Sequence, residues 1–293
     1  MLELKNLTKS FGSFKALDDL TMTVPKGAVY GLVGPNGAGK STAIRHLTGI
    51  YRPDCGQITL DGQPIYENVA QKTRIGSIPD DIFYFPSASL EEMRKYYAGL
   101  YPKFDQALYY KLFEAFDLPK KAPLRRFSKG MQKQAAFHLT LCTRPEVLVL
   151  DEPVDGLDPV MRRQVWSLIL SEVAKEETTV LISSHNLREL EDICDHVGIM
   201  DHGRMLLQRS LADMQGATHK LQLVGNIPEG LEILHQNQSG RLTTLIVRGK
   251  AEDIAAKARA AQCVYFDVLP LSLEEIFIYE LGGVNYEVKN IVL

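Results

Sequence analysis

Gly34-Pro35-Asn36-Gly37-Ala38-Gly39-Lys40-Ser41 is the stretch of sequence that decides the fold. It follows a short apolar run at 28–33 and precedes a helical pattern from Lys40 to about Leu47. A glycine-rich loop between a strand and a helix is the context in which G-x-x-x-x-G-K-[ST] binds phosphate groups. Glycines let backbone N–H groups turn toward phosphate oxygens, and the start of a helix carries a partial positive charge. The stretch therefore predicts a phosphate site, with a structural turn as the weaker alternative.

The side chains of this loop predict how the phosphates are held. Lys40 is expected to neutralise the β- and γ-phosphates, and the Ser41 hydroxyl is expected to bind Mg²⁺. The expected ligand is therefore a nucleoside triphosphate with its magnesium ion. The residues predicted to line it are Gly34, Pro35, Asn36, Gly37, Ala38, Gly39, Lys40, Ser41 and Thr42.

Two carboxylates follow a second apolar run, at 147–150. Such a run is typical of a strand buried on both faces, and open α/β folds bind their ligands where these strands end. Asp151 is expected to hold Mg²⁺, and Glu152 is expected to be the general base that polarises an attacking water. A solvated strand end is the alternative interpretation, and the nearby phosphate loop disfavours it.

A histidine ends a third apolar run. His185 follows Val180-Leu181-Ile182-Ser183-Ser184 and is expected at the same sheet edge as Asp151, within reach of a γ-phosphate. The other histidines show no metal-ligand spacing, so we expect them to be structural or exposed.

Composition limits the class of protein. The chain has 293 residues and a formal net charge of −3, which disfavours a dedicated nucleic-acid binder, so no nucleic-acid partner is expected. Its four cysteines form no CxxC pair, which argues against a disulfide framework or a zinc site. No window approaches the length of an uninterrupted apolar membrane span. If the protein works at a membrane, a partner has to cross it.

Strand-like and helix-like patterns alternate along most of the chain, which predicts a mainly parallel sheet with helical crossovers. Strands are predicted at 2–8, 14–24, 178–182, 221–224, 242–247 and 264–268, and helices at 90–118, 128–142, 159–174, 187–194, 251–261 and 273–281. Residues 215–218 resemble a linker. We therefore predict a main domain at 1–214, with a helical insertion at about 88–145, and a small accessory α/β domain at 218–293.

The motifs occur in a characteristic order. After the phosphate loop come Ser128-Lys129-Gly130-Met131-Gln132, Asp151-Glu152-Pro153, Gly156-Leu157-Asp158 and His185. This ordered set resembles the nucleotide-binding subunit of an ABC transporter, over about residues 1–214. The resemblance implies an α/β P-loop ATPase domain with a mainly parallel sheet, an antiparallel β edge and a helical insertion. The small C-terminal α/β domain is appended to it.

The resemblance also implies roles for single residues. ATP and Mg²⁺ are the implied ligands, with Phe11 stacking on adenine and His185 contacting the γ-phosphate. Ser128 and Gly130 resemble the signature motif that reaches the ATP held by the other subunit of a dimer. Asp158 resembles the acidic residue that organises the dimer interface and the attacking water.

The implied partners are an integral-membrane permease and a second ATPase subunit, identical or homologous. The implied location is the cytoplasm, on the inner face of the cell membrane through the permease. The segment 271–277 resembles the closing helix of bacterial drug- and lipid-exporter ATPases, which favours an exporter.

Two residues depart from the family pattern. Lys129 places a positive charge in the signature motif, where the family has glycine. Asp80 stands where the family has a glutamine that contacts Mg²⁺ and the attacking water. Asp80 is a candidate Mg²⁺ ligand, yet its charge is expected to repel the γ-phosphate.

The aromatic stretch at 82–86 admits two interpretations. It either packs onto the helical insertion or forms part of a groove that receives a helix of the permease.

Other functions remain to be weighed. A soluble ABC-type ATPase acting on ribosomes or DNA is disfavoured because the chain has one cassette, no heptads and no basic tail. A non-hydrolysing regulatory half of a heterodimer is suggested by Asp80 and Lys129, but Glu152 and His185 argue against it. A simple P-loop kinase is disfavoured because residues 128–130 and His185 would have no role in it.

Overall fold

The computed structural model describes residues 1–82, 84–85 and 87–281, and it divides into two compact units. The first unit comprises Met1–His185 and Gly198–Gln208, and the second comprises Asn186–Val197 and Arg209–Leu293. In the part of the chain that the structure describes, no helix combines the length and the apolar character needed to cross a membrane. The domain limits expected from the sequence stay a prediction.

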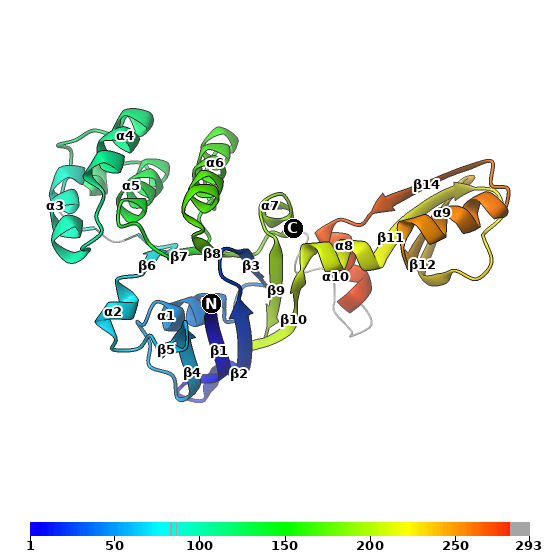
Figure 1. The fold of residues 1–293 in the computed structure, drawn as a ribbon, viewed down its shortest axis with the longest axis horizontal. Coiled ribbons are helices and arrows are strands. Elements are labelled where there is room, and N and C mark those ends of the chain that lie inside the picture. The colour runs from blue at the N-terminus through cyan, green and yellow to red at the C-terminus, as the bar shows by residue number, and fades with distance from the viewer. Residues whose placement is uncertain (83, 86, 282–293) are drawn as a thin grey trace. The chain divides into compact units, whose positions relative to one another are not determined.

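The phosphate loop follows β3, a strand of a six-stranded sheet with the order β10-β9-β3-β8-β7-β6 (Figure 1). The pairs β3–β8, β7–β8 and β6–β7 are parallel, as the alternating pattern predicts. β3, β7 and β8 are buried along their whole length because both faces of this part of the sheet are covered. The strands are β3 Val29–Val33, β6 Ile75–Ile78, β7 Val147–Asp151, β8 Thr179–Ser184, β9 His196–Asp201 and β10 Arg204–Ser210.

The expected antiparallel edge is a four-stranded sheet of its own, with the order β2-β1-β4-β5 (Figure 1). Leu2 of β1 pairs with Val24 of β2 on one side and with Leu60 of β4 on the other. Its apolar side chains share one core cluster with those of α1, β3 and β7. The strands are β1 Leu2–Phe11, β2 Phe14–Val24, β4 Cys55–Leu60 and β5 Gln63–Pro64.

Several helices of the first unit begin at a side chain that caps their first N–H groups. Ser89 and Glu92 form a capping box on α3, and Asp105, Ser128 and Asp158 cap α4, α5 and α6. The single helix predicted at 90–118 is wrong: α3 and α4 are separate, because Pro102 interrupts the pattern and Asp105 starts a new helix. The bounds are α1 Lys40–Leu47, α2 Val69–Lys72, α3 Leu90–Leu100, α4 Gln106–Phe116, η1 Leu124–Arg126, α5 Lys129–Leu141 and α6 Pro159–Glu176.

The second unit contains an antiparallel sheet with the order β12-β13-β11-β14. Leu221, Leu245 and Val247 of the sheet pack against Ile254 and Ala258 of α9 and form a small core of their own. The linker predicted at 215–218 is wrong, since these residues belong to the end of α8 and the start of β11. The elements are α7 Leu187–Glu191, α8 Leu211–Ala217, β11 Thr218–Val224, β12 Glu232–Ser239, β13 Leu242–Arg248, α9 Ala251–Ala260, β14 Tyr265–Pro270 and α10 Leu273–Leu281.

Candidate active site

The glycine-rich loop connects the end of β3 to the start of α1. Gly39 is the N-cap of α1 with φ +100°, and it offers no side chain to the first N–H groups of the helix. A Cβ at Gly34 would lie 2.3 Å from the carbonyl oxygen of Met200. The loop therefore needs glycine at both positions, and it leaves the positive end of α1 free to attract an anion.

Lys40 is buried, with 6% of the residue exposed. Its Nζ donates to the carbonyl oxygens of Gly34 at 2.6 Å and Pro35 at 3.3 Å, and it lies 3.8 Å from Oε1 of Glu152. Burial lowers the pKa of Lys40, and the carboxylates of Glu152 and Asp151 oppose that shift. The lysine thus bends back over its own loop, with its charge directed at the acid pair.

The acid pair is held by a serine of the neighbouring strand. Asp151 at the end of β7 pairs in register with Ser183 of β8. The Ser183 hydroxyl donates to Oδ1 of Asp151 at 2.5 Å and accepts from the backbone N–H of Glu152 at 3.0 Å. Ser183 was not among the predicted site residues, although its hydroxyl ends an apolar run, a position from which it can reach the acidic end of a neighbouring strand.

Glu152 lies between two cationic or polar partners. Its Oε2 lies 2.9 Å from Nδ1 of His185, and its Oε1 faces Lys40. Burial raises the pKa of Glu152, while His185 and Lys40 act in the opposite direction. The structure therefore brings together Lys40, Asp151, Glu152 and His185.

A hollow of about 290 Å³ lies in front of the loop. Phosphate-loop residues from Asn36 to Thr42 line it, together with Asp80, Glu152 and two residues that the sequence analysis did not select, Phe14 and Ala16. Its volume falls near the lower end of the range for small-molecule sites. The hollow joins one basic and two acidic side chains to the anion-binding end of a helix, which suits a phosphate group with a divalent cation.

Phe11 is not among the residues that line this hollow. Its ring makes an edge contact with Tyr51 at a centroid distance of 5.5 Å, and Phe11 pairs with Phe14 across the β1–β2 turn. Both phenylalanines are exposed. Stacking of Phe11 on adenine stays a prediction, and Phe14 is a second aromatic at the same end of the hairpin.

Ser128, Gly130 and Asp158 also do not line the hollow. The Ser128 hydroxyl accepts from the N–H of Met131 at 3.3 Å, and Asp158 accepts from Val160 at 3.0 Å and Met161 at 3.1 Å. Ser128 and Asp158 are exposed at the starts of α5 and α6. Their expected contacts with a second subunit stay predictions.

Lys133 is a site residue that the sequence analysis missed. It lies on α5, its Nζ donates to the carbonyl oxygens of Glu152 and Asp155 at 2.8 Å each, and it lies 3.9 Å from Oδ1 of Asp80. Burial raises the pKa of Asp80, and Lys133 opposes that shift. No spacing along the sequence relates position 133 to the acid pair.

The donors near the hollow fit a magnesium ion. Ser41 and Asp80 line the hollow, and Asp151 is the last residue of β7 at the same sheet edge. All three side chains offer the oxygen ligands that Mg²⁺ prefers. Among the described residues, no cluster of three or more His, Cys, Asp or Glu side chains could hold a metal ion by itself.

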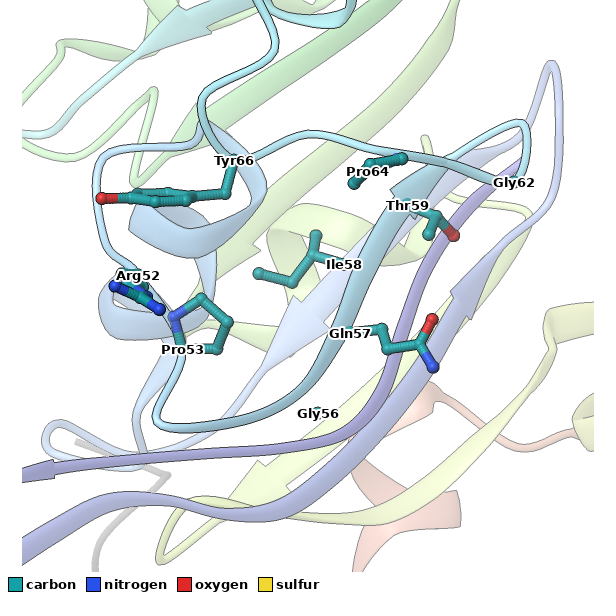
Figure 2. Close-up of a pocket in the computed structure, with 9 residues that line it drawn as sticks. All are labelled: Arg52, Pro53, Gly56, Gln57, Ile58, Thr59, Gly62, Pro64 and Tyr66. Carbon is teal, nitrogen blue, oxygen red and sulfur yellow. The ribbon is translucent and has the colours of Figure 1, made fainter.

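A second hollow of about 320 Å³ lies beside β4 and β5 (Figure 2). Tyr66, Pro53 and Ile58 line one part of it, and Arg52 is the one charged residue among the nine that surround it. It brings together no acid, base or phosphate-binding loop, so we do not assign it to the reaction.

Comparisons with known proteins identify the family of this chain. The family model described as ABC transporter matches residues 17–155. The chain is 31% identical over 288 residues to the ABC transporter ATP-binding protein YtrB of Bacillus subtilis strain 168, covering 97% of this chain and 99% of that protein. It is 30% identical over 296 residues to the Nod factor export ATP-binding protein I of Sinorhizobium fredii strain NBRC 101917 / NGR234, covering 96% and 86%.

Solved structures with a similar fold include two ATP-binding parts of ABC transporters. The ATP-binding subunit of an ABC transporter superposes with a TM-score of 0.68 at 29% identity, over 73% of this chain and 92% of that one. A bacterial ABC transporter cassette solved as a dimer gives a TM-score of 0.66 at 18% identity, over 72% of this chain and 99% of that one, a likeness of fold alone.

Proposed function

The chain belongs to the family of ABC transporter ATP-binding proteins, and from this premise we propose that it hydrolyses ATP to power a separate membrane permease that exports its cargo. The observation that carries the proposal is the meeting of Lys40, Glu152 and His185 beside the phosphate loop. Lys40 Nζ lies 3.8 Å and His185 Nδ1 lies 2.9 Å from the carboxylate of Glu152. A base flanked by two groups that interact with phosphate suits the attack of water on a γ-phosphate.

The triphosphate would occupy the hollow in front of α1, with its oxygens bound by N–H groups of residues 34–42. Lys40 would exchange the carbonyl oxygens of Gly34 and Pro35 for the β- and γ-phosphates, which are stronger partners for an ammonium group. Ser41, Asp151 and Asp80 would hold Mg²⁺, whose charge offsets that of the phosphate oxygens. Phe11 would stack on the adenine.

Glu152 would take a proton from a water molecule while the water oxygen attacks the γ-phosphorus. The bond to the β-phosphate oxygen breaks, and ADP and inorganic phosphate leave. Burial raises the pKa of Glu152, so its carboxylate is a stronger base than an exposed glutamate. His185 would orient Glu152 and contact the γ-phosphate.

The second half of each site would come from a second subunit. Ser128 and Asp158 are exposed, and with Gly130 they stand apart from the hollow of their own chain. We propose that Ser128 and Gly130 contact the γ-phosphate bound by the other subunit, where the start of α5 adds a partial positive charge. Asp158 would organise the interface. Whether the second subunit is a copy of this chain or a homologue is decided by the purification below.

The permease would contact an aromatic surface of the helical insertion. Phe85 and Tyr96 are each 47% exposed, with ring centroids 5.2 Å apart, whereas Tyr84 donates from its hydroxyl to the carbonyl oxygen of Gln132 at 2.9 Å. Tyr84 packs onto the helical insertion, as the first interpretation of the aromatic stretch has it, and the exposed rings of Phe85 and Tyr96 support the second, a contact with the permease. Phe83 and Pro86 lie outside the described residues.

Residues 1–214 would form the ATPase domain at the inner face of the membrane, and residues 218–293 would form an accessory domain.

The test is a purification of a trapped complex. The Glu152→Gln variant is tagged, purified with ATP from detergent-solubilised native cells, and its partners are identified by mass spectrometry. Glu252→Gln, a change of the same chemistry at an exposed position of α9, is the matched control and should keep wild-type turnover.

We expect Glu152→Gln to lose hydrolysis, to retain ATP in a dimer and to bring down a protein with several membrane spans. Ribosomal proteins or DNA in its place would favour a soluble ATPase. Bound ATP without phosphate release by the wild type, with or without its partners, would favour a regulatory subunit. Wild-type hydrolysis by Glu152→Gln would overturn the role of this residue.

A further inference from the structure

Lys133 is a buried lysine on α5, whereas most lysines on helices are exposed to solvent. It is 6% exposed, and a buried ammonium group is costly unless hydrogen bonds and opposite charges surround it. Here it has two carbonyl acceptors at 2.8 Å, from Glu152 and Asp155, and the Asp80 carboxylate at 3.9 Å. All three partners come from segments other than α5, so the lysine ties this helix to the loops that follow β6 and β7.

The backbone that Lys133 binds is strained. Glu152 has φ +47°, in the left-handed region that a residue with a Cβ adopts at an energetic cost. Such a conformation persists only when its surroundings hold it on more than one side. The Ser183 hydroxyl accepts from the N–H of Glu152 at 3.0 Å, and Lys133 donates to its carbonyl oxygen at 2.8 Å. Lys133 therefore supplies one of two side-chain bonds that hold the general base in this backbone conformation.

Lys133 also faces the acidic departure from the family pattern. Asp80 lines the same hollow as Lys40 and Glu152, where an uncompensated carboxylate would repel phosphate oxygens. The buried Lys133 ammonium group lies 3.9 Å from Oδ1 of Asp80 and offsets part of the charge of that carboxylate. Lys133 thus contacts both acidic residues of the hollow. It binds the backbone carbonyl of Glu152 and faces the carboxylate of Asp80.

We propose that Lys133 is a positioning residue for ATP hydrolysis, which holds the Glu152 peptide in its left-handed conformation and balances the charge of Asp80 beside the phosphates. This inference rests on the proposed function. Lys133 touches neither water nor nucleotide in this assignment. It acts by directing the Glu152 carboxylate into the space between Lys40 and His185.

The test compares ATP hydrolysis by the full-length wild type and four variants: Lys133→Met, Lys133→Arg, Asp80→Asn and the double variant Lys133→Met/Asp80→Asn. Lys111→Met, at an exposed position of α4, is the matched control. A misplaced catalytic group costs on the order of 100-fold in rate, so we expect Lys133→Met to lower kcat by about that factor. The unbalanced Asp80 carboxylate should raise the KM for MgATP by a smaller factor, and the melting temperature should change little. Lys133→Arg keeps the charge and several donors, and should restore most of the rate.

Asp80→Asn should raise the rate of Lys133→Met by about 5-fold or more, because it removes the carboxylate that lysine no longer balances. The same change in the wild-type background should not raise the rate, because Lys133 already balances this carboxylate and an amide oxygen is a weaker Mg²⁺ ligand than a carboxylate. This coupling is the readout that a purely structural lysine would not produce. If Lys133→Met does not fold, Lys133→Gln, which keeps an amide donor but loses the charge, takes its place in the cycle.

The outcomes separate this inference from the proposed function. A wild type that binds but does not hydrolyse ATP would refute the proposed function itself. A wild type that hydrolyses ATP, with Lys133→Met within about twofold of it, would overturn the role of Lys133 alone. A loss of rate that follows the loss of melting temperature, without rescue by Lys133→Arg or Asp80→Asn, would also overturn it.

Discussion

His185 Nδ1 lies 2.9 Å from Oε2 of Glu152, although the two residues are far apart in the sequence. The contact follows from the sheet, because β7 and β8 are parallel neighbours and Asp151 is in register with Ser183. Glu152 comes one residue after that pair and His185 two residues after it. A histidine that interacts with the base from an exposed position is well placed to change partners when phosphate binds.

Replacing His185 should separate turnover from nucleotide binding. We expect His185→Ala to lower kcat by about 100-fold, the cost of a misplaced catalytic group, because His185 orients Glu152. ATP affinity should stay within a few-fold of the wild type. Phosphate release and binding of a fluorescent ATP analogue measure the two properties. His202→Asn is the control, since His202 is 94% exposed by its side chain and asparagine tolerates its positive φ. Wild-type turnover by His185→Ala would contradict the prediction.

The pH dependence of hydrolysis should report Glu152. Burial raises the pKa of this carboxyl above its ordinary value of 4.5, so the protonated, inactive form persists to higher pH than for an exposed glutamate. The acid limb of kcat/KM should therefore lie above pH 4.5, and His185→Ala should move it higher still, because His185 lowers the pKa of Glu152. Rate profiles recorded where circular dichroism shows a folded chain test this. A limb that moves to lower pH in His185→Ala would oppose the assignment.

Substitution by alanine should reduce the free energy of unfolding by different amounts at two glycines of the phosphate loop. Gly37 has φ +83° and a Cβ there would meet no atom within 4 Å, whereas Gly39 has φ +100° and its Cβ would lie 2.7 Å from the carbonyl oxygen of Ala16. We expect Gly37→Ala to lower the free energy of unfolding by about 1 kcal/mol and Gly39→Ala by about 3 kcal/mol, since only the second adds a steric clash to the strain. Urea unfolding of both variants provides the comparison, and equal losses would contradict the steric argument.

His138 should make the protein less stable in mild acid. Burial lowers its pKa to about 4, although Nε2 lies 2.7 Å from the carbonyl oxygen of Tyr109, a bond that favours the charged form. A folded-state pKa below the unfolded value of 6.5 contributes stability above pH 6.5, and this contribution is lost as the pH falls toward 4. The loss should amount to about 3 kcal/mol and be absent in His138→Gln, whose amide keeps a donor. Urea unfolding at both ends of this pH range, for both proteins, measures it.

The sequence predicts elements well where local chemistry determines them. The helix from Lys40 to Leu47 and the strand at 14–24 have the predicted bounds, because a glycine loop and Pro25-Lys26-Gly27 punctuate the chain there. β12 was missed because all of its residues are exposed, so it shows no alternation of apolar and polar residues. The break between α3 and α4 was missed because apolar residues continue across it and hide the cap at Asp105.

Some residues of the candidate site could be predicted from the sequence, and others could not. Lys40, Asp151, Glu152 and His185 were predicted to converge because each ends a strand or starts a helix at one edge of a parallel sheet. Lys133 could not be predicted, since its bonds go to backbone carbonyl oxygens, which leave no trace in residue type. Contacts of this kind depend on how one helix packs against two loops, and only coordinates reveal them.

The left-handed backbone of Glu152 has a consequence for the evolution of this protein. Asparagine or glycine at that position would relax the peptide, and the resulting protein would be more resistant to heat while losing its base. A selection for thermal stability alone would therefore favour substitutions of Glu152 that abolish ATP hydrolysis. Stability and activity are therefore opposed at a single peptide unit.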